Sequence, residues 1–460
     1  MGLVQSLIEP KQRIGEDRKI FSNAMLKAMI VPLVVEQLLQ MIVGLADTMM
    51  VSHAGEPVVA GVGLDTMIYT VFIYLFTAIS TGGAVVVAQY LGSGDREKSG
   101  LAASQIFCLA GMVSLVCTAL MLLFGTALLE RMYPAAEPAT MAACKTYMRI
   151  VALSFPANAV YNAGAAVQRT MGRTSVTMKV SMLANLVNVA GNAIGIFALH
   201  AGAAGVAWPT TLSWLAAAVV MTRLCFRKDQ EMRVGWKQLL RLDTGMSRRI
   251  LGVAVPNSVE STLFQAAKVV LGMLVATFGT SQIAANSTGQ TYWSLAACMG
   301  TAMSAVFITV IGRCVGAGDE EAAEWYMRKL TRLSVVLAAA WNAAVMALTP
   351  LLLPLYDLSP ETKRLILVIV AIHNLFSATV QPFAMPLSSG LRAAGDVRFT
   401  MWSSLFCTVL MRTLLSFLLA KALGMGVVGI TLAMALDWCI KAGLDVWRFR
   451  SGKWKGRHVI

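Results

Sequence analysis

The chain has 460 residues, of which 57% are hydrophobic and only 13% are charged, and its mean hydropathy is +0.67. Soluble globular domains carry about 25% charged residues, so this composition excludes an ordinary soluble domain and predicts a multi-pass protein of the lipid bilayer. The net charge of +14 is typical of the cytoplasmic loops of membrane proteins. No nucleic-acid-binding motif accompanies it. The eight cysteines lie in apolar segments without metal-ligand spacing, so no disulfide framework, zinc site or other cofactor is expected.

Residues 1–22 precede the first apolar run and lack the features of a cleaved signal peptide, so we expect them to form a cytoplasmic segment. Windows of about 20 apolar residues then predict twelve membrane-spanning helices. These predicted helices cover approximately 24–53, 58–91, 97–129, 139–168, 175–199, 202–226, 247–278, 281–315, 321–353, 360–392, 398–421 and 425–447.

Basic residues gather on alternate loops, which predicts that both termini lie in the cytoplasm and that the protein resides in the inner or plasma membrane. The longest charged interruption, 227–246, follows the sixth predicted helix. We therefore expect an N-lobe of helices 1–6 at 23–226, a cytoplasmic linker at 227–246, a C-lobe of helices 7–12 at 247–447, and a cytoplasmic basic tail at 448–460.

The two halves repeat a sequence pattern at an offset of 224 residues, or 223 near the ends of the fourth helices. Six helices in each half run the same way, which predicts an all-α protein of two six-helix bundles related by a pseudo-twofold axis along the membrane normal. Facing bundles would leave a central cleft suited to alternating access. The matching elements are Pro32 and Glu36 with Pro256 and Glu260, Gly92-Ser-Gly94-Asp95 with Gly316-Ala-Gly318-Asp319, and Arg169 and Gly172 with Arg392 and Gly395.

Glu260 and Glu36 are carboxylates inside predicted membrane helices. An ionised acid costs roughly 2.5–3.5 kcal/mol at the centre of such a helix, so each is a candidate functional site. A proline four residues earlier frees a backbone carbonyl nearby, which favours binding of a cation. The alternative is that each glutamate only binds neighbouring helices together.

Asp47 lies near the outer end of the first predicted helix and has no acidic counterpart in the second half. Desolvation can hold such a carboxylate neutral until water reaches it, which would suit proton coupling. Asn188 and Asn192 share one face of the fifth predicted helix. Amide oxygens can ligate sodium, so a Na⁺ site at Asp47, Asn188 and Asn192 is an alternative, and plain interhelical hydrogen bonding is another.

Further polar and aromatic residues occur within predicted membrane helices. Arg412 and Asp437 lie near the middle of consecutive antiparallel helices, where they could form a structural ion pair. Four residues are candidates for lining the substrate cleft, because aromatic faces suit flat cations and His373 could carry a proton. They are Gln265, Tyr161, Tyr292 and His373.

Several short motifs occur in a fixed order along nearly the whole chain. They include Asp47-Thr48-x-Met50-Val51, Ala-Gln-x-x-Gly-x-Gly-Asp at 88–95, Gln168-Arg169-x-x-Gly172, Pro256 through Gln265, Ala284-Ala285-Asn286 and Leu391-Arg392-x-x-Gly395-Asp396. With twelve helices in two halves, this set resembles the multidrug and toxic compound extrusion (MATE) transporters.

The resemblance implies secondary active efflux of small cationic amphipathic compounds, coupled to inward flow of H⁺ or Na⁺ through alternating lobes. Asp47 falls on the position of the family's first-helix aspartate. The chain departs from one branch of the family, which has an Asn-x-x-x-Asp pair where this sequence has Asn188 and Asn192. The family consists of transporters and not enzymes, and we expect a monomer.

Two other functions are compatible with a polytopic chain. A flippase or exporter of a lipid-linked or peptidic metabolite would need a larger and more basic cleft. A multi-pass membrane transferase would need an Asp-rich metal motif or a histidine-centred base near the headgroups, and the sequence offers neither.

Overall fold

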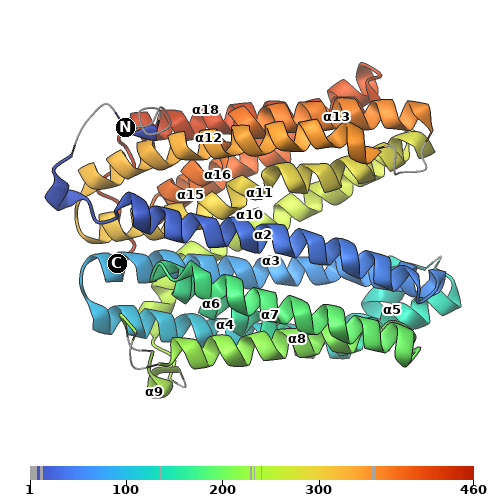
Figure 1. Ribbon diagram of the computed structural model, residues 1–460, viewed down its shortest axis with the longest axis horizontal. Helices are drawn as coiled ribbons and strands as arrows, with labels where there is room; N and C mark the ends of the chain where they lie inside the picture. Colours follow the sequence, from blue (N-terminus) through green and yellow to red (C-terminus); the bar gives the residue numbers. More distant parts are fainter. Residues whose placement is uncertain are drawn as a thin grey trace. The chain divides into compact units, whose positions relative to one another are not determined.

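The computed structural model describes residues 8–10, 14–134, 136–227, 230–232, 234–239, 241–353 and 359–460. Parts of the expected N-terminal segment 1–22 and of the expected linker 227–246 therefore lie outside the described residues. Regular structure in the described ranges is helical throughout, as Figure 1 shows. The prediction of an all-α protein is confirmed.

Eleven helices among the described residues are long and apolar enough to cross a membrane, and one bent helix pair raises this number to twelve. This result agrees with the twelve predicted segments. The chain packs as two compact units, which we call the N-terminal unit, Lys27–Ser258, and the C-terminal unit, Met1–Leu26 with Val259–Ile460. The units change over inside helices α2 and α10, so each of these helices contributes residues to both.

The N-terminal unit holds the first half of the repeat. Its helices are α2 (Asn23–Ser52), α3 (Glu56–Gly92), α4 (Arg96–Met132), α5 (Pro138–Ala152), α6 (Phe155–Thr170), α7 (Thr174–Ala193), η2 (Ile194–Ala198), α8 (Gly202–Cys225), α9 (Trp236–Leu239) and the start of α10 (Thr244–Ala276).

The C-terminal unit holds the second half. Its helices are η1 (Glu16–Arg18), the rest of α10, α11 (Thr280–Gly316), α12 (Glu320–Leu352), α13 (Pro360–Thr379), α14 (Gln381–Ala384), α15 (Pro386–Ala393), α16 (Val397–Ser404), η4 (Leu405–Met411), α17 (Arg412–Ser416), η5 (Phe417–Ala422) and α18 (Gly426–Arg450).

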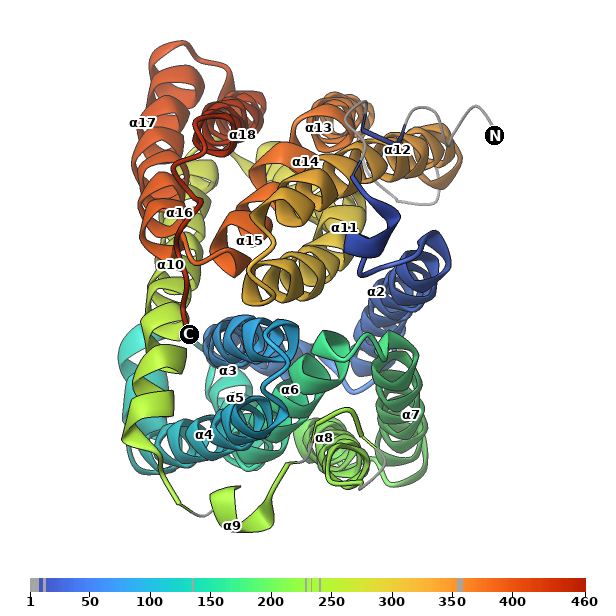
Figure 2. The same cartoon turned by 90° about the vertical axis from the view of Figure 1, so that its left-hand side faces the viewer.

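The second long helix of each half forms the centre of its unit. α3 and α11 both have 37 residues, and each follows a glycine with positive φ, Gly55 at 98° and Gly279 at 93°. In the N-terminal unit α3 packs against α4, α5 and α6, and in the C-terminal unit α11 packs against α12, α13 and α15 (Figure 2). Small and β-branched residues fill the contact side of α3, where residues 85–88 are fully buried. The repeat seen in the sequence is thus a repeat of packing within each unit.

The fourth span of each half is broken. The predicted helix at 139–168 consists of α5 and α6, which meet at a bend of 48°. The predicted helix at 360–392 consists of α13, α14 and α15. Proline causes these breaks because it lacks an amide hydrogen: Pro156, Pro382 and Pro386 each lie in the first turn of the helix that follows a break.

The repeated Gly-x-Gly-Asp loops are helix-to-helix turns. Gly94 and Gly318 have φ values of 78° and 74°, a left-handed conformation that favours glycine. Asp95 then caps α4 by accepting a hydrogen bond from the Lys98 amide at 2.9 Å. Asp319 caps α12 in the same way. The motif therefore ends one helix and starts the next.

The N-terminal segment packs on the C-terminal unit. The Phe21 amide donates to the Tyr326 hydroxyl at 2.9 Å, and that hydroxyl donates to the Phe21 carbonyl at 2.8 Å. Arg18 pairs with Asp319 at 2.9 Å. The C-terminal tail reaches the same helix, since Lys455 pairs with Glu324 at 2.6 Å. Arg18, Phe21 and Lys455 therefore all contact the first part of α12.

Candidate functional site

Glu36 of α2 forms a buried ion pair in the N-terminal unit. Only 1% of its side chain is exposed, and its Oε1 lies 2.8 Å from Nη2 of Arg169 at the end of α6. The Thr177 hydroxyl on α7 donates to the other carboxylate oxygen at 3.1 Å. One acid thus joins three helices of the unit.

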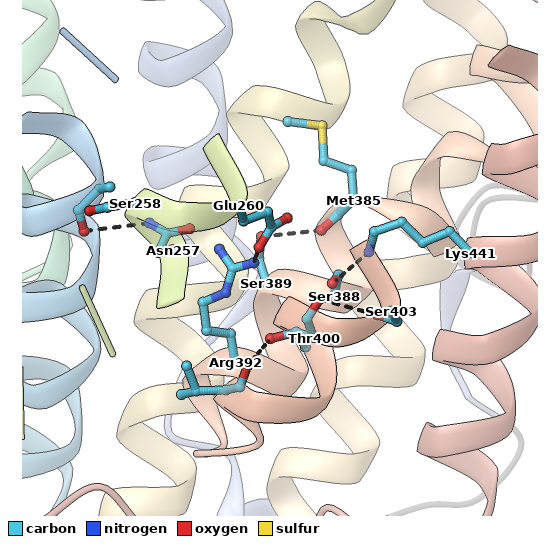
Figure 3. A network of polar contacts seen from close by, with 12 residues as sticks. Asn257, Ser258, Glu260, Met385, Ser388, Ser389, Arg392, Thr400, Ser403 and Lys441 are labelled. Carbon is cyan, nitrogen blue, oxygen red and sulfur yellow. Dashed lines mark hydrogen bonds and ion pairs between the residues drawn. The ribbon is translucent and has the colours of Figure 1, made fainter. Parts of the chain in front are cut away.

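Glu260 of α10 repeats this arrangement in the C-terminal unit. Its Oε2 lies 2.7 Å from Nη2 of Arg392 on α15 (Figure 3). The Glu260 side chain is 23% exposed, more than Glu36, whereas Arg392 is 11% exposed, less than Arg169 at 28%. Nearby, Lys441 of α18 donates to the Ser388 hydroxyl at 2.9 Å (Figure 3). The same lysine also donates to Asp445 at 2.8 Å.

The two arginines explain why both glutamates are tolerated inside a membrane protein. Each arginine belongs to an Arg-x-x-Gly motif, and the glycines Gly172 and Gly395 have φ values of 76° and 97°. The glycine ends the helix just beyond the arginine, which leaves the guanidinium able to reach back to the glutamate. Neither glutamate is a free carboxylate, and both were predicted as cation-coupling residues from the sequence.

Asp47 has different surroundings. Its Oδ1 accepts a hydrogen bond from Nδ2 of Asn192 at 2.9 Å. The side-chain amide of Asn188 is oriented by its neighbours, with its nitrogen toward the Asp47 carboxylate and its oxygen toward Thr210. It then donates to both oxygens of Asp47 at 2.9 Å and turns its Oδ1 toward the Thr210 hydroxyl at 3.2 Å. The structure thus brings together Asp47, Asn188 and Asn192, which the sequence grouped as one candidate site.

This site is a carboxylate held by neutral amides. Within the part of the chain that the structure describes, no Lys, Arg or His side chain forms an ion pair with Asp47. Oδ1 of Asn192 is buried without a hydrogen-bond partner. Two amide donors stabilise the ionised acid without cancelling its charge. Asp47 therefore stays the candidate for binding a monovalent cation.

The structure also brings Arg412 and Asp437 together. Nε of Arg412 donates to Oδ2 of Asp437 at 2.6 Å, and the two side chains are only 2% and 1% exposed. Arg412 begins α17, which lies between the π-helical stretches η4 and η5. Such stretches often occur at functional positions.

Of the four predicted cleft residues, three are buried and one is half-buried. Tyr161, Tyr292 and His373 are 4%, 5% and 6% exposed, so all three lie in the interior of their own unit. The ring of Tyr161 contacts that of Trp214 with centroids 5.4 Å apart. Gln265 is half-buried on α10, and its Oε1 has no hydrogen-bond partner.

Asp65 and Lys268 are intramembrane residues that the sequence reasoning missed. Asp65 of α3 is 3% exposed and lies near Tyr69, Cys144 and Tyr147, and no basic side chain pairs with it in the described ranges. Lys268 of α10 lies among aromatic rings. Each is an ionisable residue inside a predicted span, the criterion that singled out Glu260.

The repeat agrees with a known family. The sequence profile of the MatE family matches residues 32–194 and 256–418, so the second match begins and ends 224 residues after the first. The chain belongs to the MatE family. MatE proteins are transporters, which sets aside the membrane-transferase alternative. The helices therefore form a multi-pass membrane transporter.

MatE relatives align along nearly the whole chain. An uncharacterized transporter of Bacillus subtilis, YisQ, is 26% identical over 92% of this chain and 93% of its own length. A protein of Thermotoga maritima named probable multidrug resistance protein NorM is 25% identical over 98% and 96%.

Solved MATE structures share the fold. The outward-facing conformation of a multidrug resistance MATE transporter of the MOP superfamily matches with a TM-score of 0.87 at 20% identity, over 98% of both chains. A MOP superfamily transporter from Pyrococcus furiosus, described as having a binding pocket of reversed polarity that suggests a different function, matches with a TM-score of 0.86 at 20% identity over 97% of both chains. The protein thus has the two-lobe MATE fold.

Proposed function

We propose that the protein is a secondary active antiporter that exports cationic amphipathic compounds in exchange for an inward-moving cation. The observation that carries the proposal is the Asp47 site. It offers an acid in a membrane helix, held by amides and without a basic partner in the described ranges. Relatives named as probable multidrug resistance proteins support the choice of small organic substrates. The protein would lie in the inner or plasma membrane with both termini in the cytoplasm, and it would need no cofactor.

The proton is the coupling ion that the amide orientation favours. Both Asn188 and Asn192 direct N–H groups at the carboxylate, so in this arrangement the amides present donors to Asp47 and not oxygen ligands to a metal ion. Sodium is the second candidate, because the unpartnered Oδ1 of Asn192 and the Thr210 hydroxyl are oxygen ligands within the same group of helices. Either ion would bind and leave at Asp47.

One acid is enough to drive export. One net charge that moves inward supplies about 2.3 kcal/mol per 100 mV, which sustains roughly a fiftyfold gradient of a substrate without net charge. Exchange of one proton for a substrate of charge +1 moves no net charge, so the pH gradient alone drives it, with about 1.4 kcal/mol per pH unit. In this proposal Glu36 and Glu260 do not carry the ion, because each already compensates an arginine. They hold α2 to α6 and α10 to α15 during transport.

Everted vesicles test the proposal. Uptake of a fluorescent cation is measured first under an imposed pH gradient and then under a sodium gradient. We expect Asp47→Asn to abolish driven uptake and the exposed-site control Glu97→Gln to retain it. Driven uptake at the wild-type rate by Asp47→Asn would contradict the proposal. Uptake driven only by the sodium gradient would show that the coupling ion is sodium and not the proton.

A further inference from the structure

Lys268 is a cation on a membrane helix without a carboxylate partner. It lies in α10, a predicted span, eight residues before the helix ends at Ala276, which places it about 12 Å inside that end. No Asp or Glu side chain in the described ranges pairs with it. A lysine at this depth is costly and by default a functional residue.

The lysine does not extend toward the nearer membrane surface. Its Nζ lies 5.9 Å from the ring centroids of both Phe264 and Trp293. Phe264 is one turn earlier on α10, about 6 Å farther from the nearer helix end. The ammonium therefore points back along α10, away from the nearer helix end and unlike a snorkelling lysine, while Lys268 itself is an exposed residue.

A second cation lies on the same aromatic ring. The guanidinium carbon of Arg412 is 5.2 Å from the Phe264 centroid, so one phenyl ring contacts both Arg412 and Lys268. Asp437 balances the charge of Arg412 at 2.6 Å. The other charged groups of this region are paired with each other, as Figure 3 shows for Arg392 and Glu260. One positive charge remains without compensation.

Aromatic rings complete the surroundings of this charge. Trp293 of α11 and Trp438 of α18 are both half-buried and form an edge-to-face pair with centroids 6.3 Å apart. Such rings provide flat apolar surfaces for another ring. His373 of α13 is close enough to Arg412 to interact with it electrostatically. The group combines one free ammonium, a second cation already paired, and indole faces.

We propose that Lys268, Arg412, Phe264, Trp293 and Trp438 form a binding subsite for an aromatic compound that carries a carboxylate. Lys268 would pair with the carboxylate, Arg412 would add to the positive potential, and the tryptophans would contact the ring. The inference rests on the proposed efflux function and narrows its substrates to amphipathic aromatics with an acidic group. A cationic compound would then be bound best when it is also an acid.

Two forms of one dye test the subsite. A rhodamine with a free benzoate and the methyl ester of the same dye share the ring system and the positive charge, and they differ only in the carboxylate. Fluorescence anisotropy with the purified full-length protein measures both dissociation constants. For Lys268→Met we expect weaker binding of the free acid by about tenfold or more, with the ester unchanged. Lys268→Arg should retain the preference.

The control variant is Lys421→Met, which removes an exposed lysine of the same unit. It should change neither dissociation constant. Equal weakening of acid and ester by Lys268→Met would show a loss of structure only, and unchanged binding of both would also overturn the subsite. Because anisotropy needs no gradient, a failure of driven uptake in vesicles would contradict the proposed function and leave this test intact.

Discussion

The two halves of the repeat carry opposite chemistry at equivalent positions. Asn188, which donates to Asp47 in the first half, corresponds to Arg412 in the second, and Asp47 itself corresponds to Leu271. The second half has its uncompensated charge at Lys268. The N-terminal unit therefore presents an acid held by amides, and the C-terminal unit presents cations held by aromatic rings. Duplication kept the helices while these positions diverged.

The Glu–Arg pairs show what did not diverge. Glu36 with Arg169 and Glu260 with Arg392 have nearly the same geometry, at 2.8 and 2.7 Å. A feature present in both halves fits a part of the shared architecture. The Asp47 site and the Lys268 group each occur in one half alone. This difference fits the binding of two different ligands, a cation and an organic substrate. This comparison separates the structural acids from the acid proposed to carry the ion.

The largest expected effect is on stability, through the shared pairs. Glu36→Gln leaves Arg169 without its carboxylate, and breaking a buried ion pair costs about 3–5 kcal/mol. Glu260→Gln should cost less, because Glu260 is 23% exposed and Glu36 only 1%. Thermal unfolding in detergent measures both, with Glu97→Gln as the control. Equal melting temperatures for the two variants would contradict the prediction that the more buried glutamate contributes more to stability.

The second prediction transfers the chemistry of one half into the other. Asn188→Arg introduces the residue of the second half beside Asp47, where it should pair with the carboxylate and keep it from exchanging a cation. We expect loss of gradient-driven uptake by about 100-fold, which corresponds to roughly 2.7 kcal/mol. Binding of the free-acid dye in the C-terminal unit should stay within twofold of wild type. Gradient-driven uptake by Asn188→Arg at the wild-type rate would contradict the assignment of ion exchange to the first half.

Asp65 gives a third prediction with a smaller effect. A buried carboxylate without a basic partner opposes folding, so Asp65→Asn should stabilise the protein by about 1–2 kcal/mol. This gain raises the melting temperature by several degrees. Asn192→Ser serves as a contrast. This variant removes a hydrogen bond to Asp47 and should lower the melting temperature. A lower melting temperature for Asp65→Asn would mean that the acid has a stabilising role.

The smallest effect belongs to the helix caps. The pKa of Asp95 lies below its ordinary value because the Lys98 amide donates to it and the Lys98 side chain adds a second interaction. The folded state thus favours the carboxylate, and its contribution is present at neutral pH and disappears as the pH falls through the lowered pKa. Asp95→Ala should lower the melting temperature by roughly 2 °C at pH 7 and less near pH 3. A difference in melting temperature between wild type and Asp95→Ala that does not change with pH would exclude a stabilising role of the ionised Asp95 cap.

Hydropathy and the repeat predicted most of the fold. Twelve apolar segments and the two-half organisation follow from the composition of each helix, because the membrane imposes length and polarity locally. The bend between α5 and α6 was not predicted, because hydropathy treats 139–168 as one span, although Pro156 marks the position of the break. The sequence places the described residues up to Leu26 in a leading segment or in the first half, and they pack with the C-terminal unit.

The site was predictable where partners share a helix face and not where they come from distant helices. Asn188 and Asn192 were grouped by their spacing, and Asp47 was added because of its position in the first helix. The partners of Glu36 and Glu260 are 133 and 132 residues away. Hydropathy shows that an acid is buried but not which helix faces it. The repeated Arg-x-x-Gly motif was the signal that could have identified both arginines.

The N-terminal segment has a consequence for how the chain is made. Phe21 leaves the ribosome early, but its partner Tyr326 follows 305 residues later. At 5–20 residues per second, this interval is roughly 15 to 60 s. The segment must wait, exposed, while several hairpins of the transporter enter the bilayer. Docking of Phe21 is therefore a late step of biogenesis, and a chain arrested before α12 would remain open to proteases at its N-terminal end.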